Sequence, residues 1–277
     1  MTFGERLTTA MSERGPMCLG VDPHASLLEQ WGLADDLVSL ERFVLSCAEA
    51  FGDLAAVVKP QSAFFERFGS RGVALLERCI AEFRAAGALV LADVKRGDIG
   101  STMAAYAQAY LDPASSLAVD AITANPYLGV GALDPAFELA ERYGAGVFVI
   151  ALTSNKEAPS VQHARLADGR TVAQSVLDEL AVRNSGADPG SLGSFGVVVG
   201  ATIGDSVADL AGFNGPFLVP GIGAQGGTAA DVRRIFGDRL DAVLPSVSRE
   251  VLRAGPSVGA LRDAAERVIG DFAFLRG

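Results

Sequence analysis

Eight short apolar runs, separated by segments of helical periodicity, are the feature that most limits the folds open to this chain. Each run ends in a polar or glycine-containing turn, which is typical of buried strands in a parallel sheet. Because eight strand–helix units close a barrel, the pattern favours an α/β fold of the (β/α)8 TIM-barrel class. The runs are residues 17–21, 55–59, 88–93, 118–123, 146–152, 195–200, 217–220 and 242–247.

The segments between these runs predict an outer ring of helices. Their apolar positions return every three or four residues, in residues 37–51, 73–85, 133–143, 172–183 and 258–269. An open, doubly wound sheet is the alternative arrangement for alternating strands and helices. No linker or low-complexity tract divides the 277 residues, so we expect one domain over residues 1–277. The long irregular stretch from about Ser154 to Gly169 is a candidate lid, with a solvated loop as the alternative.

Charge and cysteine content exclude several classes of protein. The formal net charge of −10 argues against a nucleic-acid or anionic-membrane partner, so an anionic substrate would need locally concentrated positive charge. No run approaches the ~18 apolar residues of a membrane span. The odd number of cysteines, Cys18, Cys47 and Cys79, fits buried, reduced thiols in a cytoplasmic protein. The two histidines, His24 and His163, lack metal-ligand spacing, so no catalytic metal is predicted.

Polar residues at the ends of the predicted strands are the candidates for a catalytic site. In a barrel of this class the functional groups come from the carboxyl ends of several strands, which meet at one mouth. These residues include acids, amides and cations. They are Asp22, Lys59, Asp93, Lys95, Asn125, Ser154, Gln225 and Arg249.

The run from Asp93 to Asp98 is the most concentrated group of charges at a strand end. Asp93 and Lys95 lie two residues apart, so their side chains share a face if the strand continues that far. Lys59, fixed in direction by Pro60, can reach the same mouth. One interpretation is a structural network of ion pairs at the barrel rim. The other is a lysine whose proton is held by neighbouring acids until a substrate atom takes it.

A glycine-rich loop after the seventh run indicates a phosphate site. Residues 220–227 contain the spacing G-x-G-x-x-G, but no acidic residue follows about 20 residues later at a strand end, as a dinucleotide fold requires. Barrels use the loops after strands seven and eight to bind phosphate, where glycine allows close approach of the backbone. Arg249, predicted to end the eighth strand, would add a forked cation.

These motifs together resemble the orotidine 5′-phosphate decarboxylase family, in its longer bacterial subgroup, type 2. Residues 93–99, Asp-Val-Lys-Arg-Gly-Asp-Ile, are similar to the family signature D-x-K-x-x-D-I. The resemblance extends in order along nearly the whole chain, through residues 19–22, 58–61, 124–127, 152–155 and 220–227.

The resemblance implies a role for each candidate residue. Lys95 is the proton donor beside Asp93 and Lys59, while Asp98 and Thr102 serve the partner's site in a homodimer with shared active sites. The substrate, orotidine 5′-phosphate, loses CO₂ to give UMP without a cofactor. Its ribose is held by Asp22 and Lys59, its pyrimidine faces Ser154, and its phosphate meets Gln225 and Arg249. Asn125 lies in a matching segment and is a further substrate-binding candidate. Ser248 departs from the family pattern, in which glycine commonly precedes the arginine.

Two other functions stay open from the sequence. Another phosphate-binding barrel enzyme, such as a sugar-phosphate decarboxylase or aldolase, would need a metal ion or a Schiff-base lysine. A non-catalytic nucleotide-binding module would bind UMP without turning over the orotate nucleotide.

Overall fold

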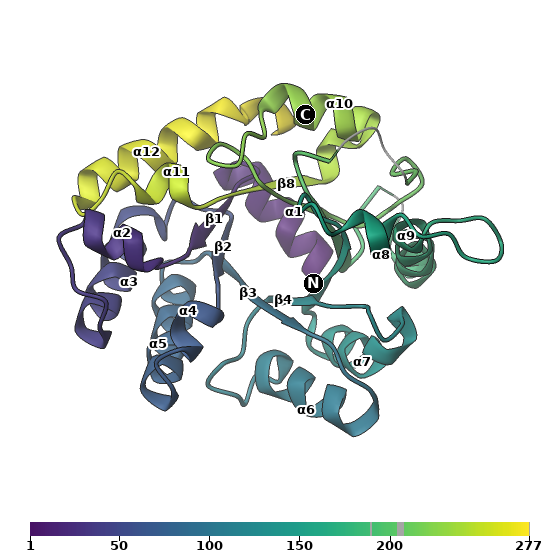
Figure 1. The fold of residues 1–277 in the computed structure, drawn as a ribbon, viewed down its shortest axis with the longest axis horizontal. Coiled ribbons are helices and arrows are strands. Elements are labelled where there is room, and N and C mark those ends of the chain that lie inside the picture. Colours follow the sequence, from purple (N-terminus) through teal and green to yellow (C-terminus); the bar gives the residue numbers. More distant parts are fainter. Residues whose placement is uncertain (189, 204–207, 277) are drawn as a thin grey trace.

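The eight apolar runs form parallel strands that close on themselves (Figure 1). This computed structural model describes residues 1–188, 190–203 and 208–276. Gly277 and the two internal gaps of the predicted domain, residues 1–277, therefore lie outside the described residues. Direct pairing of the first strand with the last, Cys18 with Ser246 and Leu19 with Val247, excludes an open sheet and confirms the barrel. The strands are β1 (Cys18–Val21), β2 (Val57–Pro60), β3 (Leu89–Arg96), β4 (Ala121–Ala124), β5 (Gly146–Leu152), β6 (Phe195–Val199), β7 (Phe217–Pro220) and β8 (Val243–Val247).

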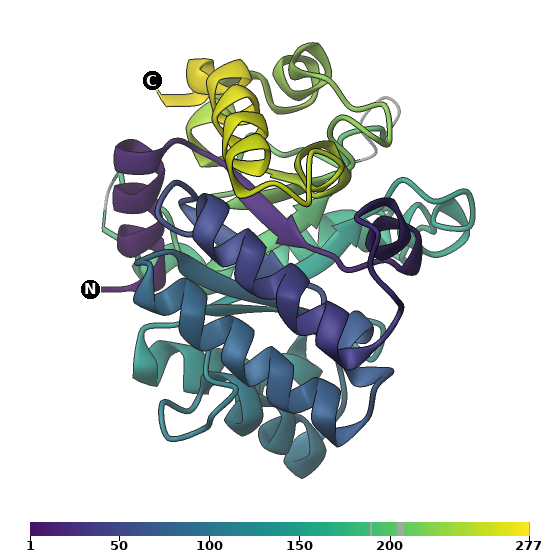
Figure 2. The same ribbon diagram turned by 90° about the vertical axis from the view of Figure 1, so that its left-hand side faces the viewer.

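Helices surround the barrel as the periodicity predicted (Figures 1 and 2). The bounds of α3 and α9 agree with the prediction, and a side-chain cap explains each start: Asp36 accepts from Ser39 N at 2.8 Å, and Thr171 accepts from Gln174 N at 3.0 Å. The helices are α1 (Phe3–Arg14), α2 (Ala25–Gln30), α3 (Leu37–Phe51), α4 (Ala63–Glu66), α5 (Ser70–Ala85), α6 (Gly100–Leu111), α7 (Asp134–Tyr143), α8 (Pro159–Gln162), α9 (Val172–Arg183), α10 (Ala229–Phe236), α11 (Arg249–Leu252) and α12 (Val258–Asp271). The described residues also contain four 3₁₀ helices: η1 (Val130–Leu133), η2 (Asn184–Gly186), η3 (Gly237–Ala242) and η4 (Ala273–Arg276).

Two differences from the predicted elements affect the mouth of the barrel. The third strand does not end at Asp93 but continues to Arg96, so Lys95 belongs to β3. The stretch from Ser154 to Gly169 is not wholly irregular, because it contains the short helix α8. None of the described helices is both long and apolar enough to cross a membrane.

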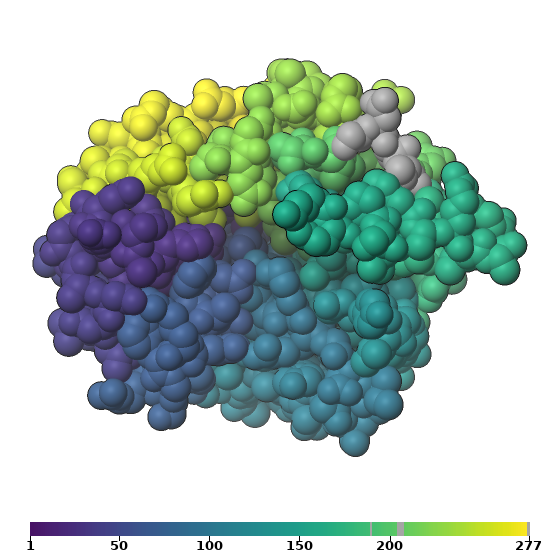
Figure 3. Space-filling view, in the orientation of Figure 1, coloured from purple at the N-terminus to yellow at the C-terminus, as the bar shows by residue number. Residues whose placement is uncertain are grey.

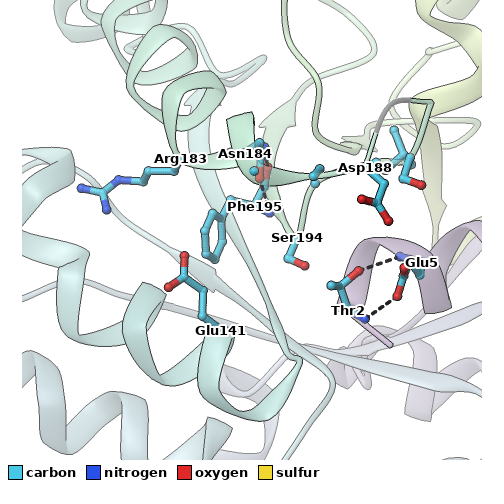
Figure 4. Close-up of a pocket in the computed structure, with 13 residues that line it drawn as sticks. Thr2, Glu5, Glu141, Arg183, Asn184, Asp188, Ser194 and Phe195 are labelled. Atoms are coloured by element: carbon cyan, nitrogen blue, oxygen red, sulfur yellow. Dashed lines mark hydrogen bonds between the residues drawn. The ribbon is translucent and has the colours of Figure 1, made fainter.

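Apolar side chains fill the barrel and close its amino-terminal end. Helix α1 lies across that end, and Phe3 packs edge-on against Phe148 with ring centroids 5.9 Å apart. A capping box starts this helix, with Thr2 and Glu5 bonded reciprocally (Figure 4). A cavity of about 350 Å³, drawn in Figure 4, lies beside helix α1 and the beginning of β6, at the end of the barrel opposite the mouth.

Close packing inside the barrel leaves no room for a side chain at Gly196 on β6. A Cβ atom there would lie 2.5 Å from the Phe148 ring and 2.6 Å from the Pro216 carbonyl oxygen. We expect Gly196→Ala to lower the free energy of unfolding by roughly 1–3 kcal/mol, measured by urea denaturation, because the core must shift to accept the methyl group.

Gly270 on α12 is the matched control, because no described atom lies within 4 Å of its Cβ position. Gly270→Ala is expected to leave stability unchanged or raise it by up to about 1 kcal/mol, through helix propensity. Equal losses in the two variants would contradict the packing argument.

Candidate active site

The carboxylate of Asp93, on β3, is the centre of the barrel mouth and receives four hydrogen bonds. Its Oδ2 accepts from Lys59 Nζ and from Gln61 Nε2, each at 2.9 Å. Its Oδ1 accepts from Lys95 Nζ at 2.5 Å and from Thr123 Oγ1 at 2.8 Å. Since a carboxylate offers about four acceptor positions, every one is occupied and the side chain has a single orientation.

Neighbouring parallel strands bring these donors together. Lys59 lies on β2, Gln61 directly follows that strand, and Thr123 lies on β4, on the other side of β3. The backbone of Asp93 is also held, because its carbonyl accepts from the amide and the hydroxyl of Ser62, each at 3.3 Å. The sequence therefore positions Asp93 through contacts on both sides of its strand.

Electrostatics divide the two lysines into a buried one and an accessible one. Lys59 is 6% exposed and Asp93 7%, whereas the Lys95 side chain is 48% exposed. Burial alone would raise the pKa of Asp93, but the charges of Lys59 and Lys95 outweigh it and hold that pKa well below its usual range. Burial lowers the pKa of Lys59, but Asp93 and Asp22 outweigh burial and raise it. Lys59 and Asp93 are therefore both charged, and of the two lysines Lys95 is the one with a largely solvent-exposed side chain.

An irregularity in β3 turns Lys95 toward Asp93. Between Ala92 and Arg96 the strand advances four residues while its partner β4 advances two, from Ile122 to Ala124. Lys95 has a φ of +45°, in the left-handed region that costs a non-glycine residue roughly 1–3 kcal/mol. Its amide donates to Thr123 Oγ1 at 2.9 Å, which helps to hold this conformation. The predicted convergence of Asp93 and Lys95 is confirmed, although a bulge rather than regular alternation produces it.

A cavity of about 330 Å³ adjoins Asp93 and opens at the centre of the face shown in Figure 3. Lys59, Asp93 and Asp22 form one side of it, and the glycine-rich loop after β7 forms the other with Gln225 and Arg249. The structure thus brings together five of the residues predicted from strand ends. Arg249 is corrected in one respect, because it begins α11 rather than ending β8.

The glycine-rich loop has the backbone that a phosphate cradle requires. Three of its glycines have positive φ values, +99° at Gly221, +67° at Gly223 and +92° at Gly226. Glycine adopts such angles at little cost and lets a ligand approach the backbone closely. Across the cavity, Asp22 lines the wall, and its buried Oδ1 has no hydrogen-bond partner among the described residues.

Five other predicted residues lie outside the lining of this cavity: Lys95, which bonds to the lining residue Asp93, and four more around the mouth. Ser154 is exposed and packs over Gly200, at the end of β6, while Asn125 is exposed and caps Tyr127 N at 3.1 Å. Asp98 is half-buried and accepts from the amide of Ile99 at 2.8 Å. Thr102 is exposed on α6.

Sequence reasoning missed several residues of this site. Thr123 was visible only as a polar residue ending the fourth apolar run, and Gln61 as a polar residue two positions after Lys59. His24, which sequence reasoning left out, lines the cavity and packs against Phe64 with ring centroids 4.3 Å apart. Ser246 and Ser248 of the β8 end also line it.

The arrangement is suited to an anionic ligand and to proton transfer. One ammonium is buried as a fixed charge, another is accessible and bonded to a carboxylate, and an arginine with a glycine loop lies across the cavity. The described residues contain no group of three His, Cys, Asp or Glu side chains arranged to hold a metal ion.

Comparison with known proteins places residues 15–264 in a single family model, described as the orotidine 5′-phosphate decarboxylase / HUMPS family. The chain is 65% identical over 270 residues to an orotidine 5′-phosphate decarboxylase of Salinispora tropica, covering 98% of this chain and 96% of the relative. It is 61% identical over 265 residues to the same enzyme of Streptomyces coelicolor, with 96% and 95% covered.

Solved structures agree with these sequence matches. A crystal structure from Streptomyces avermitilis, provisionally described as an orotidine 5′-phosphate decarboxylase, has a TM-score of 0.95 and 60% identity, covering 99% of this chain and 95% of that one. The OMP decarboxylase of Leishmania donovani has a TM-score of 0.76 and 30% identity, with 100% and 99% covered.

The ion pairs around Asp93 make a testable contribution to stability. The pKa of Asp93 is lower in the folded chain than the unfolded value of about 3.9. The contribution of the Asp93 charge to the free energy of unfolding is therefore present above about pH 4 and is lost as the pH falls through the pKa of the folded state. We expect Asp93→Asn to lower the free energy of unfolding at pH 7 by roughly 3–5 kcal/mol, because Lys59 stays buried without its carboxylate. The difference from wild type should shrink below about pH 4.

Urea denaturation between pH 7 and the lowest pH at which both proteins are folded measures this difference. Asp35→Asn is the control, because Asp35 forms an exposed pair with Arg67 and should cost less than about 1 kcal/mol. An Asp93→Asn deficit as small as that of the control would contradict the structural role of the pairs.

Proposed function

Because this chain belongs to the orotidine 5′-phosphate decarboxylase / HUMPS family, we propose that Lys95 is the acid of a decarboxylation at its barrel mouth. The high identity over nearly the full chain assigns the reaction: orotidine 5′-phosphate is converted to UMP and CO₂, in pyrimidine biosynthesis. The observation that carries the proposal for Lys95 is its accessible ammonium, held 2.5 Å from the buried Asp93 carboxylate. Membership of the type 2 subgroup stays a prediction.

The reaction needs fixed positive charge at one carbon atom. When the bond from C6 to the carboxylate breaks, its electron pair stays on C6, where no adjacent carbonyl can accept it. Stabilisation must therefore come from charge already in place and from rapid protonation. The Lys95 ammonium supplies both, because it faces the developing carbanion and then transfers a proton from Nζ to C6.

Asp93 has two roles in this proposal. Its carboxylate orients Lys95 through their hydrogen bond. It also lies where the substrate carboxylate must come, and two like charges in contact disfavour the bound substrate more than the transition state, in which the leaving group becomes neutral CO₂. Lys59 neutralises the charge of Asp93 through their ion pair, and it is too buried to serve as the proton donor itself.

The rest of the substrate follows the cavity away from Lys95. We place its 5′-phosphate on the glycine-rich loop with Gln225 and Arg249, and its ribose hydroxyls against Asp22 and Lys59. The position of Asp22 and Lys59 in one wall of the cavity supports this direction, because a carboxylate and an ammonium can both hydrogen-bond to ribose hydroxyls. The pyrimidine edge then faces the rim that carries Ser154 and Asn125.

We infer that the active enzyme is a homodimer in which Asp98 and Thr102 complete the partner's site. An exposed apolar patch beside these residues supports a second copy as the occupant: Ile99 is 63% exposed, Tyr127 78% and Leu128 54%. The two loops that carry the patch touch, since Gly97 packs against the Asn125 carbonyl. The buried free thiols of Cys18, Cys47 and Cys79 support a reducing, cytoplasmic location.

Removal of the proposed proton donor tests the mechanism. We expect wild-type protein to consume orotidine 5′-phosphate in the presence of a chelator, and Lys95→Ala to lose at least about 10⁴-fold in kcat, since charge stabilisation and protonation both disappear. Loss of substrate absorbance measures both rates. Arg78→Met, a change on the exposed face of α5, is the control and should keep full activity.

Different outcomes identify the other functions. Inactivation of the wild type by chelator would indicate a metal-dependent barrel enzyme. Binding of UMP without consumption of orotidine 5′-phosphate would indicate a non-catalytic nucleotide-binding module. Equal activity of wild type and Lys95→Ala would reject Lys95 as the acid.

Mixing two inactive variants tests the shared site. Asp98→Ala and Lys95→Ala subunits should form mixed dimers in which one site regains both residues, so a random equal mixture is expected to recover about a quarter of wild-type activity. Each variant alone is the control. Absence of recovery after demonstrated subunit exchange would contradict a site shared between chains.

A further inference from the structure

The side chain of Arg96 anchors the residue next to Lys95 in a cluster formed by two helices. Its Nη2 donates to Glu66 Oε1 at 2.5 Å, at the end of α4. On α6, Tyr110 lies close enough to interact electrostatically with the guanidinium, which also lies 5.4 Å from the centre of the Tyr106 ring. We call Arg96, Glu66, Tyr106 and Tyr110 the Arg96 cluster.

The backbone around Arg96 is held as firmly as its side chain. The Arg96 carbonyl accepts from Asn125 N at 2.8 Å, which is the point where β3 and β4 regain their pairing after the bulge. The following residue, Gly97, lies so close to β4 that a Cβ atom there would be 2.3 Å from the Asn125 carbonyl oxygen. Arg96 is thus the fixed end of the bulge that contains Lys95.

The conformation of Lys95 requires such an anchor. Lysine rarely adopts a φ of +45°, and it keeps this angle only when the surrounding structure determines it. On its amino-terminal side, Asp93 is held by its four hydrogen bonds and by Ser62. On its carboxyl-terminal side, the side chain that fixes the backbone belongs to Arg96.

One donor of the Arg96 guanidinium is not satisfied within the cluster. Arg96 Nε is buried and has no hydrogen-bond partner among the described residues. A buried donor without a partner costs free energy, which the ion pair with Glu66 and the contact with the Tyr106 ring offset.

We propose that Arg96 is a positioning residue of the reaction, which, through Glu66 and Tyr110, holds the bulge that directs Lys95 Nζ at the substrate. The inference rests on the proposed role of Lys95 as the acid. A positioning role differs from a purely structural role in one respect. Loss of the anchor should slow the chemical step, while the phosphate end of the substrate, which binds across the cavity, should bind as before.

Three variants test the proposal, and the two measurements are kcat for orotidine 5′-phosphate and the Kd for UMP. Arg96→Met removes all polar contacts of the guanidinium while keeping an extended side chain. Arg96→Lys can keep a pair with Glu66 but loses the fork that also reaches Tyr110. Tyr110→Phe removes a single hydroxyl. Arg78→Met on α5, which breaks exposed pairs with Glu41 of α3 and Glu82 of α5, is the matched control.

We expect kcat for orotidine 5′-phosphate to fall by about 10- to 100-fold in Arg96→Met, because small displacements of a reacting group have effects of this size. Arg96→Lys and Tyr110→Phe should have smaller losses in the same direction. The Kd for UMP should stay within about twofold of wild type in all three. Thermal unfolding defines a temperature at which each variant is folded, and all rates are measured below it.

Two results would overturn the inference. One is a kcat in Arg96→Met within twofold of the Arg78→Met control. The other is a parallel loss of UMP affinity and kcat, which would indicate general disruption of the mouth. If the proposed function itself is wrong, the results differ from these two. Wild-type protein would then be inert toward orotidine 5′-phosphate, or Lys95→Ala would be as active as wild type.

Discussion

The buried carboxylate of Asp93 is the constraint on which the mouth of this barrel depends. A charge at this depth is tolerated only if cations and hydrogen-bond donors surround it, and here they come from β2, β3 and β4. The same requirement determines the neighbouring strands: Lys59 has to lie near the end of β2 and Thr123 has to lie on β4. The two interpretations of the charge cluster are therefore compatible, since the ion pairs that close the rim also hold an accessible lysine in place.

Much of this fold was predictable because it depends on local patterns. The bounds of β5, β7, α3 and α9 agree with those expected from apolar runs and helical periodicity. Five residues on strand ends or in the segments that follow them line one cavity, because parallel strands of a barrel end at the same face. The orotidine 5′-phosphate decarboxylase motifs then identified the family, and the comparisons confirm that identification.

The parts that sequence reasoning missed depend on contacts between distant segments. Glu66 was not among the candidate residues, yet it pairs with Arg96, 30 residues later. The bulge in β3 leaves no periodic signal, because it is defined by loss of register with β4. Likewise, Arg249 was expected on β8, but the strand ends at Val247 and the arginine begins a short helix.

Local charge at the mouth explains how an acidic protein can bind an anionic substrate. The chain has a net charge of −10, but the mouth combines three cations, Lys59, Lys95 and Arg249, with two carboxylates, Asp22 and Asp93. Beneath them, burial raises the pKa of Cys18 to about 12, so this thiol adds no negative charge at neutral pH. The cations are also separated in space, with Arg249 on the glycine-loop side and the lysines around Asp93. Attraction for the phosphate can therefore offset the repulsion between Asp93 and the substrate carboxylate, and that repulsion is relieved only when CO₂ leaves.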